Sequence, residues 1–369
     1  MVDRGATGSK LRVTIDATPA LIRSAGVKNY TYYWIRSLWQ AARDEKIRAF
    51  PFLEGFGRLD HERSTLSRSG TFSRLVLIQL LRTVGSPLLD WALRDADLFH
   101  TSNQVRCAPT RAKLTATLHD LTCWLTPELH TAANIRADHE FADRILRRAD
   151  ALIAVSENTR QDAIRLLGIA PERITTIYSG VSSEYFNAVP ASRAKPYVLY
   201  LGTIEPRKNL DVLLDAWKVL PARLREEFDL VFAGSQGWNT QGTFARIQSE
   251  ATYLGYVPES GLPGLMAGAS LFVYPSLYEG FGFPVVQAMA AGVPVLTSNV
   301  SCLPEIVGDA AMLVDPKSEA EIAAGLRRLL EMQTLRLELS AKGRIQAQKY
   351  RWETCAARSL EFFHRVAGR

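Results

Sequence analysis

Short apolar runs of strand length alternate with helical patterns along nearly the whole chain. Such runs occupy residues 11–15, 114–118 and 151–155 in the first half, and 197–201, 229–233, 271–274 and 293–296 in the second. Because these runs are almost continuously apolar and lie between helices, they indicate parallel sheets that are covered on both faces. The alternation therefore predicts an α/β fold in which ligands bind at the carboxyl ends of the strands.

The chain is long enough for two domains, with 369 residues of which 47% are hydrophobic. Residues 186–196 lack periodicity and contain two prolines, a composition that is typical of a linker. We therefore predict two doubly wound Rossmann-like domains that face a central cleft, at residues 1–188 and 189–350. A C-terminal helix in residues 351–369 is predicted to cross back to the first domain.

The composition argues against a membrane-spanning, a secreted or a disulfide-linked protein. No run of about 18 or more apolar residues occurs, so the sequence does not predict a membrane-spanning helix. The first ten residues lack the apolar stretch of a secretory signal. Cys107, Cys123, Cys302 and Cys355 form no CxxC pair and are expected to be reduced thiols in a cytoplasmic protein. The net charge of +6 fits a phosphate partner, an anionic membrane or an ordinary solvated surface.

The segment 275–292 combines a strand end, a glycine-bearing turn that holds a carboxylate, and a helix with proline in its first turn. Free backbone N–H groups and the positive end of a helix would then meet at one point, where an anion such as a diphosphate binds. The N–H groups of Gly282, Phe283 and Val285 are predicted to reach the sugar or the phosphate. Glu279 is predicted to accept hydrogen bonds from sugar hydroxyls, and the alternative is a carboxylate that only complements the helix dipole. The segment therefore indicates a nucleotide-sugar site.

Two cations follow the strand predicted at residues 197–201. Arg207 offers a planar fork and Lys208 a point charge, and both groups suit phosphate oxygens. Breaking the bond between a sugar and a diphosphate builds negative charge on the leaving group, which cations stabilise. We therefore predict that Arg207 and Lys208 bind a diphosphate, and the alternative is a solvated basic loop.

Gly26 follows the first predicted strand and precedes a helix predicted at residues 32–41. A glycine there is predicted to open a turn toward the cleft, so that the start of the helix meets phosphate or acceptor. The alternative is an ordinary strand-to-helix turn. The segment is not a G-x-G-x-x-G fingerprint, which argues against a nicotinamide site.

Several motifs occur in one order along the chain, at residues 97–100, 119–121, 151–159, 202–210, 254–258, 275–284 and 303–308. With these motifs the chain resembles the retaining family 4 glycosyltransferases with the GT-B fold. The stretch Gly-Thr-Ile-Glu-Pro-Arg-Lys-Asn is most similar to the mannosyltransferase-like group. The resemblance implies transfer of a hexose from a nucleotide diphosphate sugar to an acceptor hydroxyl in polysaccharide, lipopolysaccharide or glycolipid assembly. A GDP-mannose-type donor is favoured, and a UDP-sugar is the alternative.

The resemblance also implies the roles of individual residues. His119 would lie over the donor sugar near the anomeric centre, and His119, Arg207, Lys208 and Glu279 form the predicted catalytic set. The nucleobase would lie against the turn at residues 255–258. The residues predicted to contact the donor are Gly26, Gly202, Gly234, Tyr256, Val257, Gly282, Phe283, Val285 and Gln287.

Gln287 departs from the family pattern, which has a second glutamate eight residues after the first to hold the ribose hydroxyls. A glutamine amide still accepts and donates hydrogen bonds, but each bond is expected to be weaker by roughly 1 kcal/mol because the charge is missing. We therefore expect an altered ribose contact rather than a lost activity. The alternative is a non-catalytic nucleotide-sugar binding partner of another transferase.

The implied partners are the nucleotide-sugar donor and a glycan or lipid-linked acceptor. No organic cofactor, metal ion or nucleic acid is expected, because the resemblance assigns the place of a metal to the two cations. Residues 63–82 mix arginines with a strongly apolar run, and they are predicted either to touch an anionic membrane or to form a core helix. The expected location is the cytoplasm, with the inner face of the membrane as a second location. The alternative enzyme is a nucleotide-sugar epimerase that would use His119 and Glu279 as its acid–base groups.

Overall fold

The computed structural model describes residues 10–24, 26–102, 104–105 and 107–369. Within these residues the named strands form two six-stranded sheets, one from each half of the chain. In spatial order, the first sheet has β2 (Lys46–Phe50), β1 (Arg12–Asp16), β3 (Leu98–Thr101), β4 (Lys113–Leu118), β5 (Ala151–Ala154) and β6 (Ile174–Thr176). The second sheet has β12 (Met312–Val314), β11 (Val295–Ser298), β10 (Leu271–Tyr274), β7 (Tyr197–Leu201), β8 (Asp229–Ala233) and β9 (Thr252–Tyr253).

The pairs of neighbouring strands in both sheets are parallel. The direction in which strands are added reverses between β1 and β3 in the first sheet and between β7 and β10 in the second. Open α/β sheets bind their ligands at such reversal points, beyond the carboxyl ends of the strands. The predicted α/β fold with two Rossmann-like domains is therefore confirmed.

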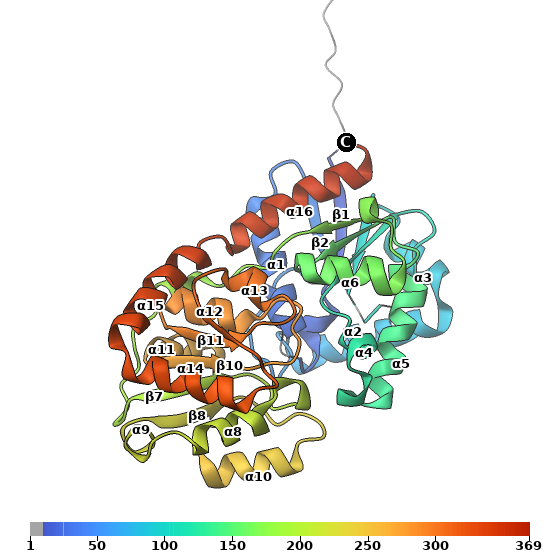
Figure 1. Cartoon of the computed structure of the whole chain (residues 1–369). Helices are drawn as coiled ribbons and strands as arrows, with labels where there is room; N and C mark the ends of the chain where they lie inside the picture. Colours follow the sequence, from blue (N-terminus) through green and yellow to red (C-terminus); the bar gives the residue numbers. More distant parts are fainter. Residues whose placement is uncertain (1–9, 25, 103, 106) are drawn as a thin grey trace, which may run out of the picture.

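Helices connect the strands in both halves and cover the sheets (Figure 1). Those of the first half are α1 (Gly26–Ala41), α2 (Arg68–Val84), α3 (Ser86–Ala92), α4 (Thr122–Leu125), α5 (Ala132–Phe141), α6 (Glu157–Leu167) and α7 (Ser183–Phe186). Those of the second are α8 (Leu210–Lys218), α9 (Ala222–Glu227), α10 (Gln241–Glu250), α11 (Leu262–Ala267), α12 (Phe283–Ala291), α13 (Leu303–Val307), α14 (Glu319–Glu331), α15 (Gln333–Ala347) and α16 (Trp352–Ala367). Across the described ranges, none of the helices combines the length and the apolar character that crossing a membrane requires.

The apolar runs of the sequence predict the central strands except β3, and they miss the edge strands. All seven predicted runs coincide with strands, although β11 begins two residues later than the run at 293–296. The edge strand β2 was not predicted, because its first three residues are at least partly exposed and two of them are charged. An edge strand is solvated along one side, so its sequence lacks the continuous apolar run that marks a strand in the middle of a parallel sheet.

The first helix begins earlier than the sequence predicts. Its expected start was residue 32, whereas α1 begins at Gly26. Gly26 is exposed, and an added Cβ would meet no atom within 4 Å. Gly26 is therefore the first residue of a helix rather than the centre of a turn, and the backbone there does not require glycine.

The C-terminal helix α16 lies over the first half of the chain, as Figure 1 shows with its red ribbon above α1 and β1. The indole Nε1 of Trp34 in α1 donates a hydrogen bond to Ser359 Oγ at 2.9 Å. Phe363 is fully buried and packs against Trp34 and His100. One hydrophobic core cluster therefore includes side chains from both halves of the chain. The exact domain boundaries at residues 188 and 350 stay a prediction.

Candidate active site

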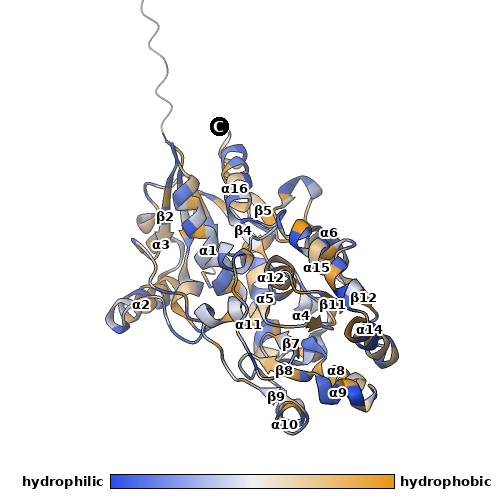
Figure 2. Ribbon diagram, turned by 90° about the vertical axis from the view of Figure 1, so that its left-hand side faces the viewer, coloured by the Kyte–Doolittle hydropathy of each residue, from blue (hydrophilic) through white to orange (hydrophobic). Residues whose placement is uncertain are grey.

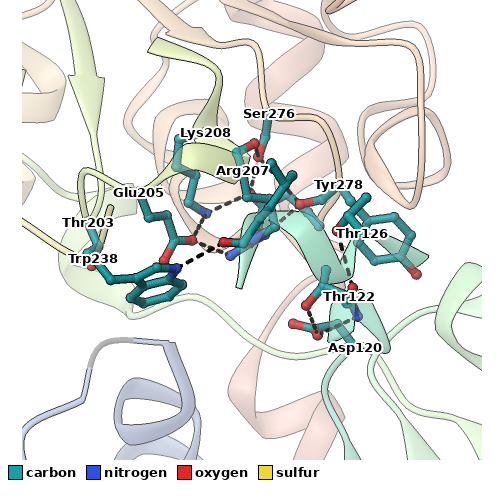
Figure 3. Close-up of polar contacts among 12 residues, drawn as sticks. Asp120, Thr122, Thr126, Thr203, Glu205, Arg207, Lys208, Trp238, Ser276 and Tyr278 are labelled. Carbon is teal, nitrogen blue, oxygen red and sulfur yellow. Dashed lines mark hydrogen bonds and ion pairs between the residues drawn. The ribbon is translucent and has the colours of Figure 1, made fainter. Parts of the chain in front are cut away.

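Charged side chains gather at the reversal point of the second sheet. Arg207 and Lys208 lie in the short helical turn η5 (Pro206–Lys208), which follows β7. Glu279 follows β10, the strand next to β7. Since carboxyl ends of neighbouring parallel strands meet at one edge of a sheet, the two segments lie together although about 70 residues separate them in the sequence. Figure 3 shows Arg207 and Lys208 with Glu205 and Ser276 at this place.

Four of these side chains, Glu205, Arg207, Lys208 and Glu279, form what we term the cation cluster. Arg207 Nη1 lies 2.9 Å from Glu279 Oε2, and Arg207 Nη2 lies 2.6 Å from Glu205 Oε1. Lys208 Nζ lies 2.6 Å from Glu279 Oε1 and 3.7 Å from Glu205 Oε1. The structure therefore brings together three of the four predicted catalytic residues and adds Glu205, which the sequence analysis did not select.

Burial and opposite charge act against each other in the cation cluster. Burial favours a neutral carboxyl group, but attraction by Arg207 and Lys208 outweighs it and lowers the pKa of Glu279 to about 2. Burial likewise opposes the charge of Arg207, yet Glu279 and Glu205 raise the pKa of its guanidinium well above its ordinary value. Both groups are therefore charged at neutral pH. A hydroxyl hydrogen bond from Ser276 Oγ to Glu279 Oε1 adds to this stabilisation.

The first turn of α12 presents backbone N–H groups beside the cation cluster. Gly282 precedes this helix with a φ of +83°, which glycine adopts without strain. In the described part of the chain, the N–H groups of Gly282 and Phe283 have no hydrogen-bond acceptor. The N–H of Val285 already donates to Gly282 O at 3.0 Å. This N–H group closes the first turn of the helix, and the contact of Val285 with the sugar or the phosphate stays a prediction.

His119 lies directly beyond the carboxyl end of β4 and faces the second domain. A Cβ atom added to Gly280 would stand 1.7 Å from His119 O, so the loop before α12 touches the backbone of the first domain. The His119 ring packs edge-on against Tyr30, with 4.9 Å between ring centroids. Burial lowers the pKa of His119 to about 4, which outweighs the opposing attraction of Asp120. At neutral pH the ring is therefore uncharged and would act as a hydrogen-bonding group rather than as a cation.

Glycines bring neighbouring strand ends of the second sheet into close contact. Gly234 follows β8 with a φ of +136°, and a Cβ there would lie 2.0 Å from the oxygen of Gly202, which follows β7. The N–H of Gly234 donates to Gly255 O at 2.8 Å. These three glycines therefore join the strand ends to the turn that the sequence predicts as the nucleobase wall.

The predicted nucleobase wall contacts the first domain in this structure. The hydroxyl of Tyr256 donates to Asp60 Oδ1 at 3.1 Å and accepts from the backbone N of His61 at 3.2 Å. The side chain of neighbouring Val257 packs against the hydrophobic core. The loop that contains Asp60 was not singled out from the sequence, since only the packing of one domain on the other brings it to this turn.

Two further residues predicted to contact the donor, Gln287 and Gly26, are not part of the cation cluster. Gln287 is in the second turn of α12 and is 8% exposed, and its amide has no hydrogen-bond partner among the described residues. A glutamine amide that has no protein partner is free to donate and to accept hydrogen bonds with a ligand. Within the described part of the chain, Gly26 makes no polar contact with the other predicted residues, and it lies at the exposed start of α1. Gln287 therefore fits a ligand contact better than Gly26 does.

Glu305 links the two domains. Its carboxylate accepts hydrogen bonds from the backbone N–H groups of Glu157 at 2.7 Å and Asn158 at 3.0 Å, at the start of α6. The helix that Glu305 caps therefore belongs to the other domain. Such capping stabilises a helix start through its free N–H groups and its dipole.

One hollow on the surface lies outside the cation cluster. A shallow hollow of about 460 Å³ is lined by Tyr32, Arg36, Trp39, Gln40, Phe56, Gly57 and Arg58, and it shares no residue with the cation cluster. Among the described residues, no group of three or more His, Cys, Asp or Glu side chains is arranged to hold a metal ion.

Comparison with known proteins identifies relatives of both halves. The sequence matches the model of group 1 glycosyl transferases over residues 181–346 and the model of glycosyltransferase family 4 over residues 25–185. O-antigen chain mannosyltransferase B of Escherichia coli is 31% identical over 382 residues, which cover 96% of this chain and 99% of that protein.

Solved structures share the same architecture. Sucrose-phosphate synthase from Thermosynechococcus elongatus superposes with a TM-score of 0.75 at 20% identity, covering 97% of this chain and 99% of that one. Anabaena HepE in complex with UDP and glucose superposes with a TM-score of 0.68 at 18% identity, covering 95% and 99%. At such identities the likeness concerns the fold alone.

Proposed function

The chain belongs to the family 4 glycosyltransferases with the GT-B fold, in the mannosyltransferase-like group, and from this premise we propose that it transfers a mannosyl group from a GDP-linked donor to a hydroxyl of a growing glycan. The relative that covers nearly the whole chain is a mannosyltransferase of an O-antigen chain, which supports a lipopolysaccharide glycan as the acceptor. HepE, a neighbour in fold, binds UDP and glucose, so a UDP-sugar is the competing donor.

The single observation that carries this proposal is the cation cluster beside the start of α12. Lys208 is buried, the side chain of Arg207 is 13% exposed, and both contact Glu279, which stands a few residues before the unpaired N–H groups of Gly282 and Phe283. Cations and N–H dipoles in a water-poor place stabilise a leaving diphosphate more strongly than they would in water. The proposal assigns the diphosphate to these groups, the sugar to His119 and Glu279, and the acceptor to the first domain.

We further propose that transfer retains the anomeric configuration and needs no metal ion. Both carboxylates of the cation cluster are ion-paired, which disfavours the covalent nucleophile that retaining glycosidases use. The departing phosphate oxygen would then accept the proton of the acceptor hydroxyl on the same face of the sugar. Nuclear magnetic resonance of the product's anomeric proton, and activity in excess chelator, test the two statements separately.

The donor is identified by two linked measurements. A thermal-shift screen with GDP, UDP and ADP should show the largest rise in Tm with GDP, because a ligand that binds only the folded state stabilises it. Incubation with GDP-mannose and a glycan acceptor should then release free GDP. The proposed function would be contradicted if none of the three nucleotides raised Tm and no nucleoside diphosphate were released from any nucleotide sugar. An epimerase would convert the sugar without releasing GDP.

We propose in addition that α2 touches an anionic membrane, where a lipid-linked acceptor would be presented. Figure 2 shows α2 at the edge of the molecule. Phe72, Val76, Leu80 and Val84 recur every four residues along it and are 72%, 43%, 49% and 55% exposed. Spacing of this kind forms one apolar face on a helix, and Arg68 is exposed at its start.

Flotation with vesicles that contain anionic phospholipid tests the membrane contact. The wild-type chain should float with the vesicles, and the double variant Phe72→Asp, Leu80→Asp should remain in the dense fraction. The matched control is Leu337→Asp in α15, which changes another side chain that is 63% exposed. Equal flotation of both variants would argue against α2 as the contact.

A further inference from the structure

The charge balance of the cation cluster has to change when a donor binds. The exposed fractions of its side chains are 13% for Arg207, 8% for Lys208, 6% for Glu205 and 9% for Glu279, and their formal charges sum to zero. A diphosphate brings two negative charges into this place. An unpaired charge in a buried site is strongly unfavourable, so the diphosphate needs the cations that a carboxylate now holds.

Glu279 is the carboxylate that can be replaced. Its two oxygens hold both cations at once, at 2.9 Å from Arg207 and 2.6 Å from Lys208. These are the positions that two phosphate oxygens would take. Glu279 lies in the loop before α12 and has a second assignment under the proposed function, the hydroxyls of the donor sugar. It therefore loses its cations and gains hydroxyl partners when a donor enters.

Glu205 is tied to the cations by the chain itself. It stands two residues before Arg207, and its backbone O accepts from the N–H of Lys208 at 3.0 Å, which closes the turn η5. Its Oε1 lies 2.6 Å from Arg207 Nη2. The guanidinium of Arg207 is planar, so fixing Nη2 also fixes the direction of Nη1, the group that now contacts Glu279. Figure 3 shows Glu205 and Arg207 turned toward each other in this way.

Resting on the proposed function, we propose that Glu205 is a positioning residue that keeps Arg207 directed at the donor diphosphate, while the carboxylate of Glu279 occupies the place of that diphosphate until the donor binds. Glu205 acts through Arg207 and contacts neither the sugar nor the acceptor. Glu279 exchanges two ion pairs for hydrogen bonds to the sugar. The two glutamates therefore have opposite effects on the affinity for a nucleoside diphosphate.

Calorimetric titration with GDP separates the two roles. Glu205→Gln keeps an oxygen for Arg207 but loses the charge, and it should bind GDP about tenfold more weakly than the wild type. Glu279→Gln removes the group that competes with the diphosphate, and it should bind GDP about threefold more tightly or better while its transfer rate falls. If Glu279→Gln bound GDP more weakly, the exchange would be refuted.

Steady-state kinetics distinguishes positioning from a general structural effect. Glu205→Gln should raise the KM for GDP-mannose and lower kcat, and it should leave the KM for the acceptor unchanged. Glu205→Asp, which restores the charge on a shorter side chain, should recover part of the loss. Unchanged GDP affinity and donor kinetics in a folded Glu205→Gln variant would overturn the positioning role.

The matched control is Glu250→Gln in α10. Glu250 pairs with Arg246 at 3.2 Å, so the substitution removes another carboxylate–arginine pair of the second domain without touching the cation cluster. Its GDP affinity should equal that of the wild type, and the same loss in both variants would also overturn the positioning role. If the wild-type chain bound no nucleoside diphosphate and released none, the proposed function itself would fail, which is a different outcome from failure of this inference alone.

Discussion

Glu279 is the residue on which the chemistry of the proposed site depends most directly. It is buried and ionised because two cations outweigh the unfavourable burial of its charge. Replacing it leaves Glu205 as the carboxylate that is ion-paired with Arg207 and Lys208. Changes at this single position therefore alter both the charge of the site and the groups available to a sugar.

Glu279→Ala is predicted to lower turnover by about 100-fold or more, because contacts to the sugar that strengthen in the transition state are lost. The measurement is the rate of GDP release with saturating donor and acceptor. Circular dichroism and the unfolding temperature establish that the variant is folded. Nearly normal turnover of a folded variant would remove Glu279 from the catalytic set.

The lowered pKa of Glu279 also predicts how stability depends on pH. A carboxyl group whose pKa falls from 4.5 to about 2 on folding stabilises the folded state above pH 4.5. That contribution, about 3 kcal/mol at most, is lost as pH falls from about 4.5 to 2. Urea unfolding at pH 6, 4 and 3 should therefore show a difference between wild type and Glu279→Gln that shrinks toward low pH. A difference that is constant over this range would contradict the lowered pKa.

At the scale of elements, the loop between β10 and α12 belongs to the second domain and touches the first. Gly280 touches the backbone of His119, and Thr159 Oγ1 in α6 donates to Gly280 O at 3.3 Å. The same loop carries Glu279 and ends at the N–H groups of α12. Its position therefore sets the distance between the sugar-binding groups of one domain and the diphosphate-binding groups of the other.

Gly280→Ala is predicted to separate these groups and to lower activity at least tenfold, because its Cβ would lie 1.7 Å from His119 O. Overpacking of this kind destabilises a protein by about 1–3 kcal/mol. The control is Gly242→Ala in α10, where an added Cβ meets no atom within 4 Å; it should leave activity unchanged and raise the unfolding temperature slightly. Equal activity of the two variants would count against the contact.

Gln287 on α12 gives a second prediction at this scale. Its amide has no partner in the described residues, and one turn of helix separates it from Phe283. Gln287→Glu should lower the KM for the donor by about fivefold, because a charged acceptor strengthens each bond to a ribose hydroxyl by roughly 1 kcal/mol. Donor kinetics at fixed acceptor concentration measures this. An increase in the donor KM would show that the glutamine is not a weakened ribose contact.

At the scale of the whole molecule, contacts between distant segments hold the two domains together. Helix α16 follows the helices of the second half in sequence but packs on α1 of the first. Glu305 caps α6 across the domain border, and Tyr256 bonds to Asp60. The site at the facing sheet edges therefore depends on residues that take no part in its chemistry.

Phe363→Ala in α16 is predicted to destabilise the protein by about 3–5 kcal/mol, since a fully buried ring that packs on Trp34 and His100 would be replaced by a cavity. Chemical unfolding followed by tryptophan fluorescence measures the loss. Leu337→Ala in α15 is the control, because a side chain that is 63% exposed should change stability by less than about 0.5 kcal/mol. Similar losses in both variants would mean that α16 contributes little to the packing of the first domain.

The sequence by itself determined the elements and the chemical groups that they carry. Continuous apolar runs predicted the central strands other than β3, because strands in the middle of a parallel sheet are buried on both faces. Strand ends followed by Arg207, Lys208 and Glu279 predicted which side chains gather at one sheet edge, since parallel strands share that edge. The start of α1 and the edge strands were less legible, because exposed positions there lack a periodic apolar pattern.

Only the tertiary structure decided which distant groups meet. The use of the Val285 N–H within its own helix turn, the capping of α6 by Glu305 and the contact between Tyr256 and Asp60 are absent from any local pattern. Glu205 and Arg207 are close in sequence, but the proposed role of their ion pair depends on Glu279, which pairs with the other terminal nitrogen of the same guanidinium. Periodicity records which residues face a core, whereas the partners of a buried charge are fixed by how the strands are ordered and how one domain packs on the other.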